Sequence, residues 1–246
     1  MASSIRKKRR PLPFREIAPN MVTSGNLLCG TMSLILVLHG RVVPAAWLVF
    51  MAVFFDFMDG KVARRLGGGT RFGLEFDSLA DVVSFGVAPA VLFYSVYAER
   101  LGVMGALAVS FFALCGALRL ARFNVTHVPG PFQGLPIPAG GLFLASFVLA
   151  GAHLSPWLAA LLALGTGALM VSSVPYSSMK KLRRGYARKK RLLLVGGAAI
   201  SGAILLESAA PLAGISLYVV SGILRFDWEK WLSVPGAEEE RVEKSL

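Results

Sequence analysis

The sequence predicts an all-α membrane protein, a polytopic bundle of eight transmembrane helices. Of its 246 residues, 55% are hydrophobic and only 16% are charged, and the mean hydropathy is +0.62. Soluble domains contain about 25% charged residues. The apolar residues also gather in stretches close to the roughly 20 residues that cross a bilayer. These stretches lie near residues 21–39, 44–66, 74–97, 101–120, 138–153, 155–175, 191–206 and 209–224, the fifth and seventh being short.

The basic residues predict the orientation of these spans. Of the 26 Lys and Arg residues, all except Arg41 and Arg100 fall on one face if the chain crosses the membrane eight times. Positive charge collects on the cytoplasmic side of membrane proteins. We therefore expect a multi-pass protein of the cell (inner) membrane with both termini in the cytoplasm. The net charge of +12 follows from this topology, so no nucleic-acid partner is expected.

The same pattern divides the chain into five segments. We expect a basic cytoplasmic N-terminal segment, a catalytic transmembrane bundle, a basic cytoplasmic loop, additional transmembrane helices and a cytoplasmic tail. Their predicted bounds are 1–17, 18–176, 177–191, 192–225 and 226–246.

An acidic stretch, DFMDGKVARRLGGGTRFGLEFDSLAD, joins the second and third spans at residues 56–81. On the second span, Asp56 and Asp59 share one helical face with the small residues Gly60 and Ala63, and Arg64 lies at the rim. At 1.5 Å per residue, Asp56 lies roughly 10 Å below the cytoplasmic boundary.

The third span continues this arrangement in the opposite direction. Gly73, Asp77 and Asp81 recur every four residues, which places them on a single helical stripe. The Gly-rich turn before them is short, so the two spans are predicted to be antiparallel neighbours. The four carboxylates can then converge on one cavity that opens to the cytoplasm.

Four ionised carboxylates at membrane depth require neutralisation. A charged residue at the centre of a membrane helix costs a few kcal/mol on insertion scales. Oxygen-only ligands without Cys or His favour Mg²⁺ or Mn²⁺ over zinc, and two such ions would balance four carboxylates and still bind a diphosphate. Two other interpretations remain open: structural aspartates paired with arginines, and a proton or cation relay in a transporter.

The acidic motif resembles the signature of the CDP-alcohol phosphatidyltransferase family. It reads Asp56-x-x-Asp59-Gly60-x-x-Ala63-Arg64, eight further residues, then Gly73-x-x-x-Asp77-x-x-x-Asp81. The resemblance implies a six-helix core with its active site in a polar cavity at the cytoplasmic side. It also implies two divalent ions, Mg²⁺ or Mn²⁺, and a homodimer.

Roles for individual residues follow from the same resemblance. It implies that Asp56, Asp59, Asp77 and Asp81 bind the metals and that Asp81 is the general base. It further implies a nucleotide and diphosphate site that comprises Asp59, Gly60, Ala63, Arg64, Thr70 and Gly73.

Three further segments resemble membrane-embedded bacterial and archaeal phosphatidylserine synthases. They are ALRLARFNV (117–125), GLPIPAGG (134–141) and ALMVSSVPYSSMKK (168–181). The resemblance implies CDP-diacylglycerol and L-serine as substrates. An arginine fork suits the serine carboxylate and an amide can read its other groups, which makes Arg119, Arg122 and Asn124 candidate acceptor-binding residues.

The acceptor alcohol and the class of protein each have alternatives. The acceptor could instead be glycerol 3-phosphate or inositol phosphate, and the lipid could be an ester or an archaeal ether. A cation-coupled membrane transporter and an aspartate-rich prenyltransferase are the rivals from other classes. The Gly60–Ala63–Arg64 pattern between the acidic pairs favours a nucleotide over a prenyl diphosphate.

Overall fold

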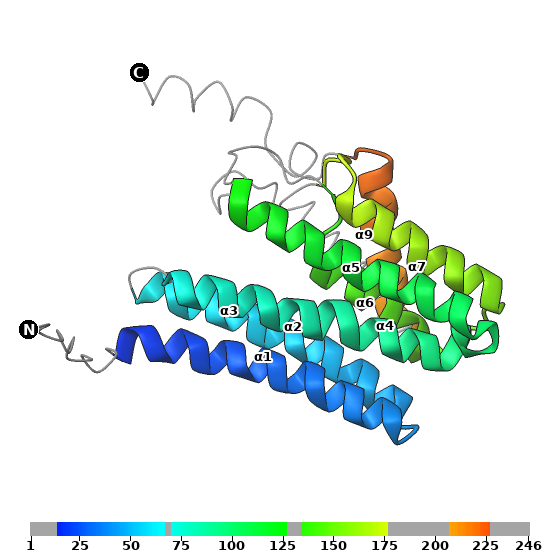
Figure 1. Ribbon diagram of the computed structural model, residues 1–246, viewed down its shortest axis with the longest axis horizontal. Helices are drawn as coiled ribbons and strands as arrows, with labels where there is room; N and C mark the ends of the chain where they lie inside the picture. The colour runs from blue at the N-terminus through cyan, green and yellow to red at the C-terminus, as the bar shows by residue number, and fades with distance from the viewer. Residues whose placement is uncertain (1–13, 67–69, 127–133, 177–206, 227–246) are drawn as a thin grey trace, which may run out of the picture.

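The computed structural model describes residues 14–66, 70–126, 134–176 and 207–226, and the regular structure in these ranges is helical. Four of the described helical segments are long and apolar enough to cross a membrane (Figure 1). They are Ala18–Leu38, Val42–Arg65, Arg71–Leu101 and Val103–Val125. The predicted membrane helix bundle is thereby confirmed.

Helices α1 (Phe14–Leu38) and α2 (Val42–Arg65) form an antiparallel hairpin. Gly40 closes the turn between them with a φ of +70°, a backbone conformation that costs glycine little. Ala45, Ala46 and Ala52 are fully buried on α2 because small side chains let the two helices approach closely. Across this contact the Ser33 hydroxyl donates to the carbonyl of Ala45 at 2.9 Å.

The third span is a single long helix with two π-helical segments. It comprises α3 (Arg71–Asp81), the π-helical η1 (Val82–Val87), α4 (Ala88–Phe93), the π-helical η2 (Tyr94–Ala98) and a 3₁₀ turn, η3 (Glu99–Leu101). Pro89 lacks an N–H, so the carbonyl of Phe85 cannot receive its ordinary α-helical hydrogen bond. The widened turn η1 covers this position and directly follows Asp81.

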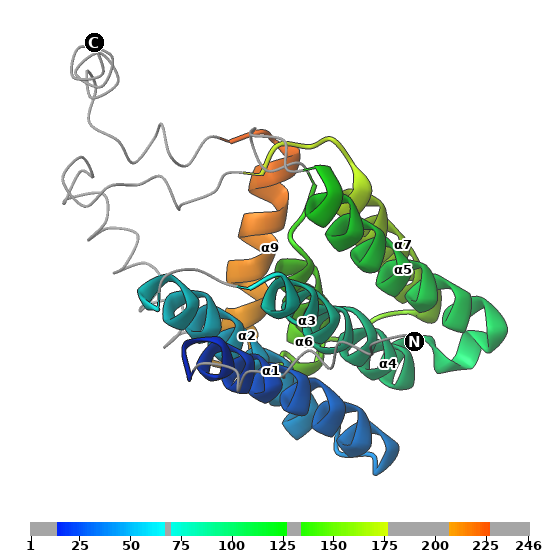
Figure 2. The ribbon, with the colours of Figure 1, turned by 60° about the vertical axis from the view of Figure 1, so that its left-hand side comes forward.

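The remaining described helices complete the bundle around α6 (Ile137–Leu149). Helix α5 (Val103–Thr126) packs against α7 (Pro156–Val171), while α6 contacts α2, α4 and η1. After the short 3₁₀ turn η5 (Glu207–Ala209), helix α9 (Ala210–Ile223) lies beside α6 (Figure 2). Phe85, Phe112, Ile137 and Leu144 are fully buried where these helices meet.

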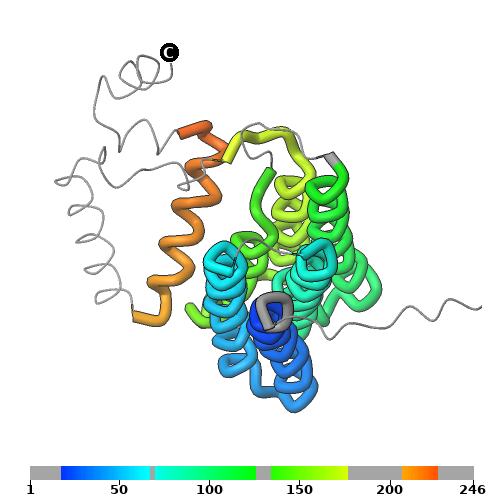
Figure 3. The backbone as a smooth tube through the Cα atoms, turned by 90° about the vertical axis from the view of Figure 1, so that its left-hand side faces the viewer, coloured from blue at the N-terminus to red at the C-terminus, as the bar shows by residue number. Residues whose placement is uncertain are grey.

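Arg64, Arg65 and Arg71 lie together at one end of the bundle, which we call the basic end. Figure 3 views the molecule from this end, with α9 at the flank. Arg41 and Arg100 belong to the turns at the opposite end. Among the described residues, these five arginines thus lie at opposite ends of the bundle axis.

Some of the predicted span lengths were wrong. The fifth and sixth stretches form helices of only 13 and 16 residues, about 20 and 24 Å at 1.5 Å per residue, short of the hydrocarbon thickness. Helix α7 ends at Val171 because Ser172 is extended. The eighth stretch corresponds to α9, and the seventh, 191–206, lies outside the described residues.

Candidate active site

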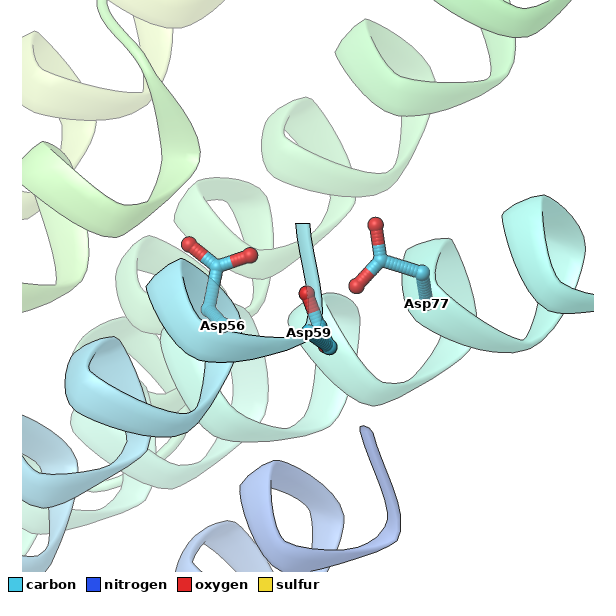
Figure 4. Close-up of side chains that lie close together, drawn as sticks. All are labelled: Asp56, Asp59 and Asp77. Carbon is cyan, nitrogen blue, oxygen red and sulfur yellow. The ribbon is translucent and has the colours of Figure 1, made fainter. Parts of the chain in front are cut away.

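Three acidic side chains from neighbouring helices meet near the basic end. One carboxylate oxygen from each of Asp56, Asp59 and Asp77 lies within 4.8 Å of the others (Figure 4). The carboxyl groups of Asp59 and Asp77 also interact with each other. Since Asp56 and Asp59 come from α2 and Asp77 from α3, the site depends on the antiparallel pairing of these helices.

Asp81 lies one turn further along α3, outside this group of three. It is 7% exposed and interacts electrostatically with Asp56, Asp77 and Asp59. Its Oδ1 atom accepts a hydrogen bond from the Asn26 side-chain amide at 2.9 Å. The four predicted carboxylates thus occupy one region, with three close enough to hold a cation and the fourth bound to Asn26.

Helix α1 supplies two polar partners that the sequence interpretation did not include. The Thr23 hydroxyl lies 2.9 Å from Oδ2 of Asp59, which is only 6% exposed, and Asn26 contacts Asp81 as described. The signal was present in the spacing of polar residues along this apolar helix, since Asn20, Thr23 and Asn26 recur every three residues. A polar stripe on a membrane helix indicates a face turned toward the bundle interior.

Close helix packing holds the Asn26–Asp81 pair in place. The Ser84 hydroxyl, from η1, donates to the backbone carbonyl of Asn26 at 2.9 Å. Gly30, one turn along α1, lies so close to Ser84 that a Cβ there would stand 2.8 Å from the Ser84 Cα. A side chain at position 30 would therefore push α1 and η1 apart.

The cluster of three carboxylates formed by Asp56, Asp59 and Asp77 fits a hard divalent cation. All of its donors are oxygens, and neither His nor Cys takes part. Oδ1 of Asp77 is buried without a hydrogen-bond partner among the described residues, as expected of an oxygen whose partner is an ion. The geometry does not distinguish Mg²⁺ from Mn²⁺.

The predicted nucleotide residues Gly60, Ala63 and Arg64 follow Asp59 on α2. A Cβ on Gly60 would meet only the Arg64 guanidinium, at 3.8 Å, so this side of α2 is open. Arg64 is exposed at the rim and Ala63 is half-buried beside it.

Two predicted nucleotide residues also have structural roles at the start of α3. Thr70 caps the helix by accepting a hydrogen bond from the Gly73 amide at 3.0 Å. A Cβ on Gly73 would come within 3.0 Å of Oδ1 of Asn20, so this glycine allows α1 to approach α3.

The candidate acceptor residues diverge in their surroundings. Arg119 is half-buried on α5 and interacts electrostatically with Asp81 and with Tyr218 of α9, whereas Arg122 is exposed. Asn124 donates through its side-chain amide to Ser78 at 3.0 Å and to Glu75 at 3.4 Å, which ties α5 to α3 beside Asp77. Tyr218 was not predicted, because its position on a helix near the end of the chain gives no local signal.

Comparisons with known proteins identify the family of this chain. The sequence model of the CDP-alcohol phosphatidyltransferase family matches residues 16–174. A protein of Bacillus subtilis named CDP-diacylglycerol–serine O-phosphatidyltransferase is 38% identical over 66% of this chain and 91% of its own length. A Helicobacter pylori protein of the same name is 36% identical over 88% of this chain and 93% of its own.

An archaeal relative carries a related name. The archaetidylserine synthase of Methanothermobacter thermautotrophicus is 41% identical over 64% of this chain and 68% of its own length. The matched range 16–174 contains the three grouped carboxylates, Asp81 and the candidate acceptor residues. On this evidence the chain belongs to the CDP-alcohol phosphatidyltransferase family, a family of membrane enzymes.

Proposed function

We propose that the protein is a CDP-diacylglycerol–serine O-phosphatidyltransferase, which transfers the phosphatidyl group of CDP-diacylglycerol to the serine hydroxyl and releases CMP. The observation that carries the proposal is the meeting of Asp56, Asp59 and Asp77 beside the buried Asp81. The names of the relatives from Bacillus and Helicobacter support serine as the acceptor.

The carboxylates on α2 and α3 have distinct tasks in this proposal. Asp56, Asp59 and Asp77 would hold Mg²⁺ or Mn²⁺ ions, with Asp81 alongside. Bound ions would polarise the diphosphate and stabilise the departing nucleotide phosphate. Thr23 fixes the orientation of Asp59 through its hydrogen bond.

Asp81 would act as the general base. It takes the proton from the serine hydroxyl as the new oxygen–phosphorus bond forms at the phosphorus that carries diacylglycerol. The bond from this phosphorus to the CMP oxygen breaks, and CMP leaves. The bond from Asn26 occupies one oxygen of Asp81 and orients the carboxyl group, so the other oxygen remains for the proton.

The residues around the carboxylates would bind the nucleotide. Because Gly60 and Ala63 have small side chains, the cytidine diphosphate could approach the backbone of α2 closely. The exposed Arg64 would supply positive charge beside it. The Thr70 hydroxyl accepts from Gly73, and its own hydrogen can be donated to a phosphate oxygen. We also propose that the basic end faces the cytoplasm of a cell with both chain termini there, and that the protein forms a homodimer.

Membranes that contain the protein test this proposal directly. With CDP-diacylglycerol, radiolabelled L-serine and Mg²⁺ or Mn²⁺, we expect labelled phosphatidylserine and an equal amount of CMP. A chelator should abolish both products, and added metal should restore them. Release of CMP with glycerol 3-phosphate or inositol phosphate, and not with serine, would assign another acceptor. Ion flux into liposomes without any CMP would assign a transporter.

A further inference from the structure

A cavity of about 620 Å³ lies at the end of the bundle opposite the basic end. Its walls come from the first residue of α2, from η2 and η3, and from the segment where α6 passes to α7. Glu99, in this wall, lies roughly 27 Å from Asp81 along the third span at 1.5 Å per residue. The cavity is therefore separate from the cluster of three carboxylates, and its volume is typical of small-molecule sites, about 300–1,000 Å³.

Charged side chains of both signs line this cavity. Glu99 and Arg100 come from η3, and His153 comes from the connection between α6 and α7. Within the described ranges, no ion pair joins Glu99 to Arg100 or to His153, so their polar atoms are available to a ligand. Much of the remaining wall is apolar and includes Val42, Val96, Val148 and Leu154. A ligand that matches this lining carries an anionic group, a cationic group and an apolar part.

Hydrogen bonds and ring packing hold the wall between η2 and α6. The Tyr97 hydroxyl, on η2, donates to the carbonyl of Phe147 at 2.8 Å, and its ring packs on Phe93 with centroids 5.0 Å apart. The same carbonyl accepts from the Ala152 amide at 3.2 Å, where the chain turns at Gly151 with a φ of +59°. Because η2 and the end of α6 are joined in this way, the cavity is a built feature of the bundle.

Trp157 indicates that the cavity lies at the level of the lipid headgroups. This residue directly follows Pro156, which lines the cavity, and is 60% exposed at the start of α7. Trp side chains gather where a membrane meets water. The cavity also lies where α2 begins and the third span ends, and both of these segments are long enough to cross a bilayer. A phospholipid can therefore bring its headgroup to Glu99 and Arg100 while its acyl chains stay in the hydrocarbon.

We propose that this cavity binds a phospholipid whose headgroup joins a phosphate to a primary ammonium, as in phosphatidylethanolamine. Arg100 and His153 donate to the phosphate, because a guanidinium fork matches phosphate oxygens. Glu99 accepts from the ammonium, and the apolar wall contacts the glycerol end of the lipid. The lipid belongs to the leaflet opposite the active site, so the inference is independent of the proposed transfer to serine.

Titration of the purified protein in detergent with short-chain lipids tests this inference. Phosphatidylethanolamine should raise the unfolding temperature to a plateau, because a ligand that binds the folded protein stabilises it. Arg100→Gln should raise the Kd for this lipid about tenfold, the effect of losing one hydrogen bond to a charged group. Glu99→Gln should also raise the Kd for phosphatidylethanolamine, but it should not weaken binding of phosphatidylglycerol, which has no ammonium.

Arg41→Gln is the matched control, since Arg41 lies at the same end of the bundle and does not line the cavity. Its Kd should equal that of the wild type, which separates loss of the site from loss of positive charge at this end. Equal stabilisation of the wild type by phosphatidylethanolamine and phosphatidylglycerol, or an unchanged Kd in both cavity variants, would overturn the inference. Equal stabilisation by free phosphoethanolamine would overturn the assignment to a lipid. None of these measurements depends on turnover, so they stand apart from the test of the proposed function.

Discussion

Replacing Gly30 by Ala should displace the proposed base without touching it. The added Cβ would stand 2.8 Å from the Ser84 Cα, whereas ordinary contact begins at 3.4 Å, so the two helices must separate by at least about 0.6 Å. Ser84 lies on the continuation of the helix that carries Asp81, and Asn26 lies one turn before Gly30. The 2.9 Å bond from Asn26 to Asp81 would lengthen toward about 3.5 Å, the limit of a hydrogen bond.

The magnitudes follow from this displacement. Overpacking of a well-packed core costs about 1–3 kcal/mol, which should lower the unfolding temperature in detergent by several degrees. A shift of the base by a large fraction of an ångström should lower kcat about 10- to 100-fold. The assay is CMP release at saturating serine and CDP-diacylglycerol, together with thermal unfolding followed by tryptophan fluorescence.

Gly165→Ala is the matched control for this prediction. Gly165 lies on α7, and a Cβ there would meet no atom within 4 Å. Alanine is favoured over glycine within a helix by about 0.5–1 kcal/mol, so this variant should be as stable as the wild type or slightly more stable, with normal kcat. A Gly30→Ala protein with the wild-type rate and unfolding temperature would refute the reasoning that close packing positions Asp81.

Three further substitutions separate the roles of the site residues. Asp81→Asn should reduce turnover to background and retain nucleotide binding, measured by calorimetry; near-normal turnover would show that another group is the base. Asp77→Asn should weaken stabilisation of the protein by Mn²⁺, measured as the metal-dependent rise in unfolding temperature, because it removes one of three grouped carboxylates; an undiminished rise would place the ion elsewhere. Thr23→Val keeps the side-chain volume but removes the hydrogen bond to Asp59, so the Mn²⁺ concentration for half-maximal activity should rise several-fold; an unchanged concentration would mean that Thr23 does not orient this ligand.

The membrane helix bundle and the cluster of three carboxylates could be predicted from the sequence because their signals are local. Helical spacing places Asp56 and Asp59 on one face, a short turn brings α3 alongside, and Asp77 then meets them. The first four spans were likewise predicted to within three residues, apart from the ends of the third and fourth, because long apolar runs leave little ambiguity.

Other features depend on contacts between distant segments and could not be predicted in this way. The partners of Asp59 and Asp81 are separated from them by 36 and 55 residues, and no periodicity links Thr23 to Asp59 or Asn26 to Asp81. The stripe of Gly73, Asp77 and Asp81 is followed directly by the π-helical turn η1, for which Pro89 was the available signal. Tyr218 reaches Arg119 only through the packing of α9 on the bundle.

The placement of Thr23 and Asn26 on α1 has a consequence for biosynthesis. These residues are translated before the aspartates that they contact, so a partner is already present in the bilayer when α2 and α3 leave the ribosome. The acidic helices can then enter the lipid with part of their polar surface already satisfied. We therefore expect insertion of this enzyme to proceed best in chain order. A protein that lacks α1 would lose the hydrogen-bond partners of the aspartates on α2 and α3.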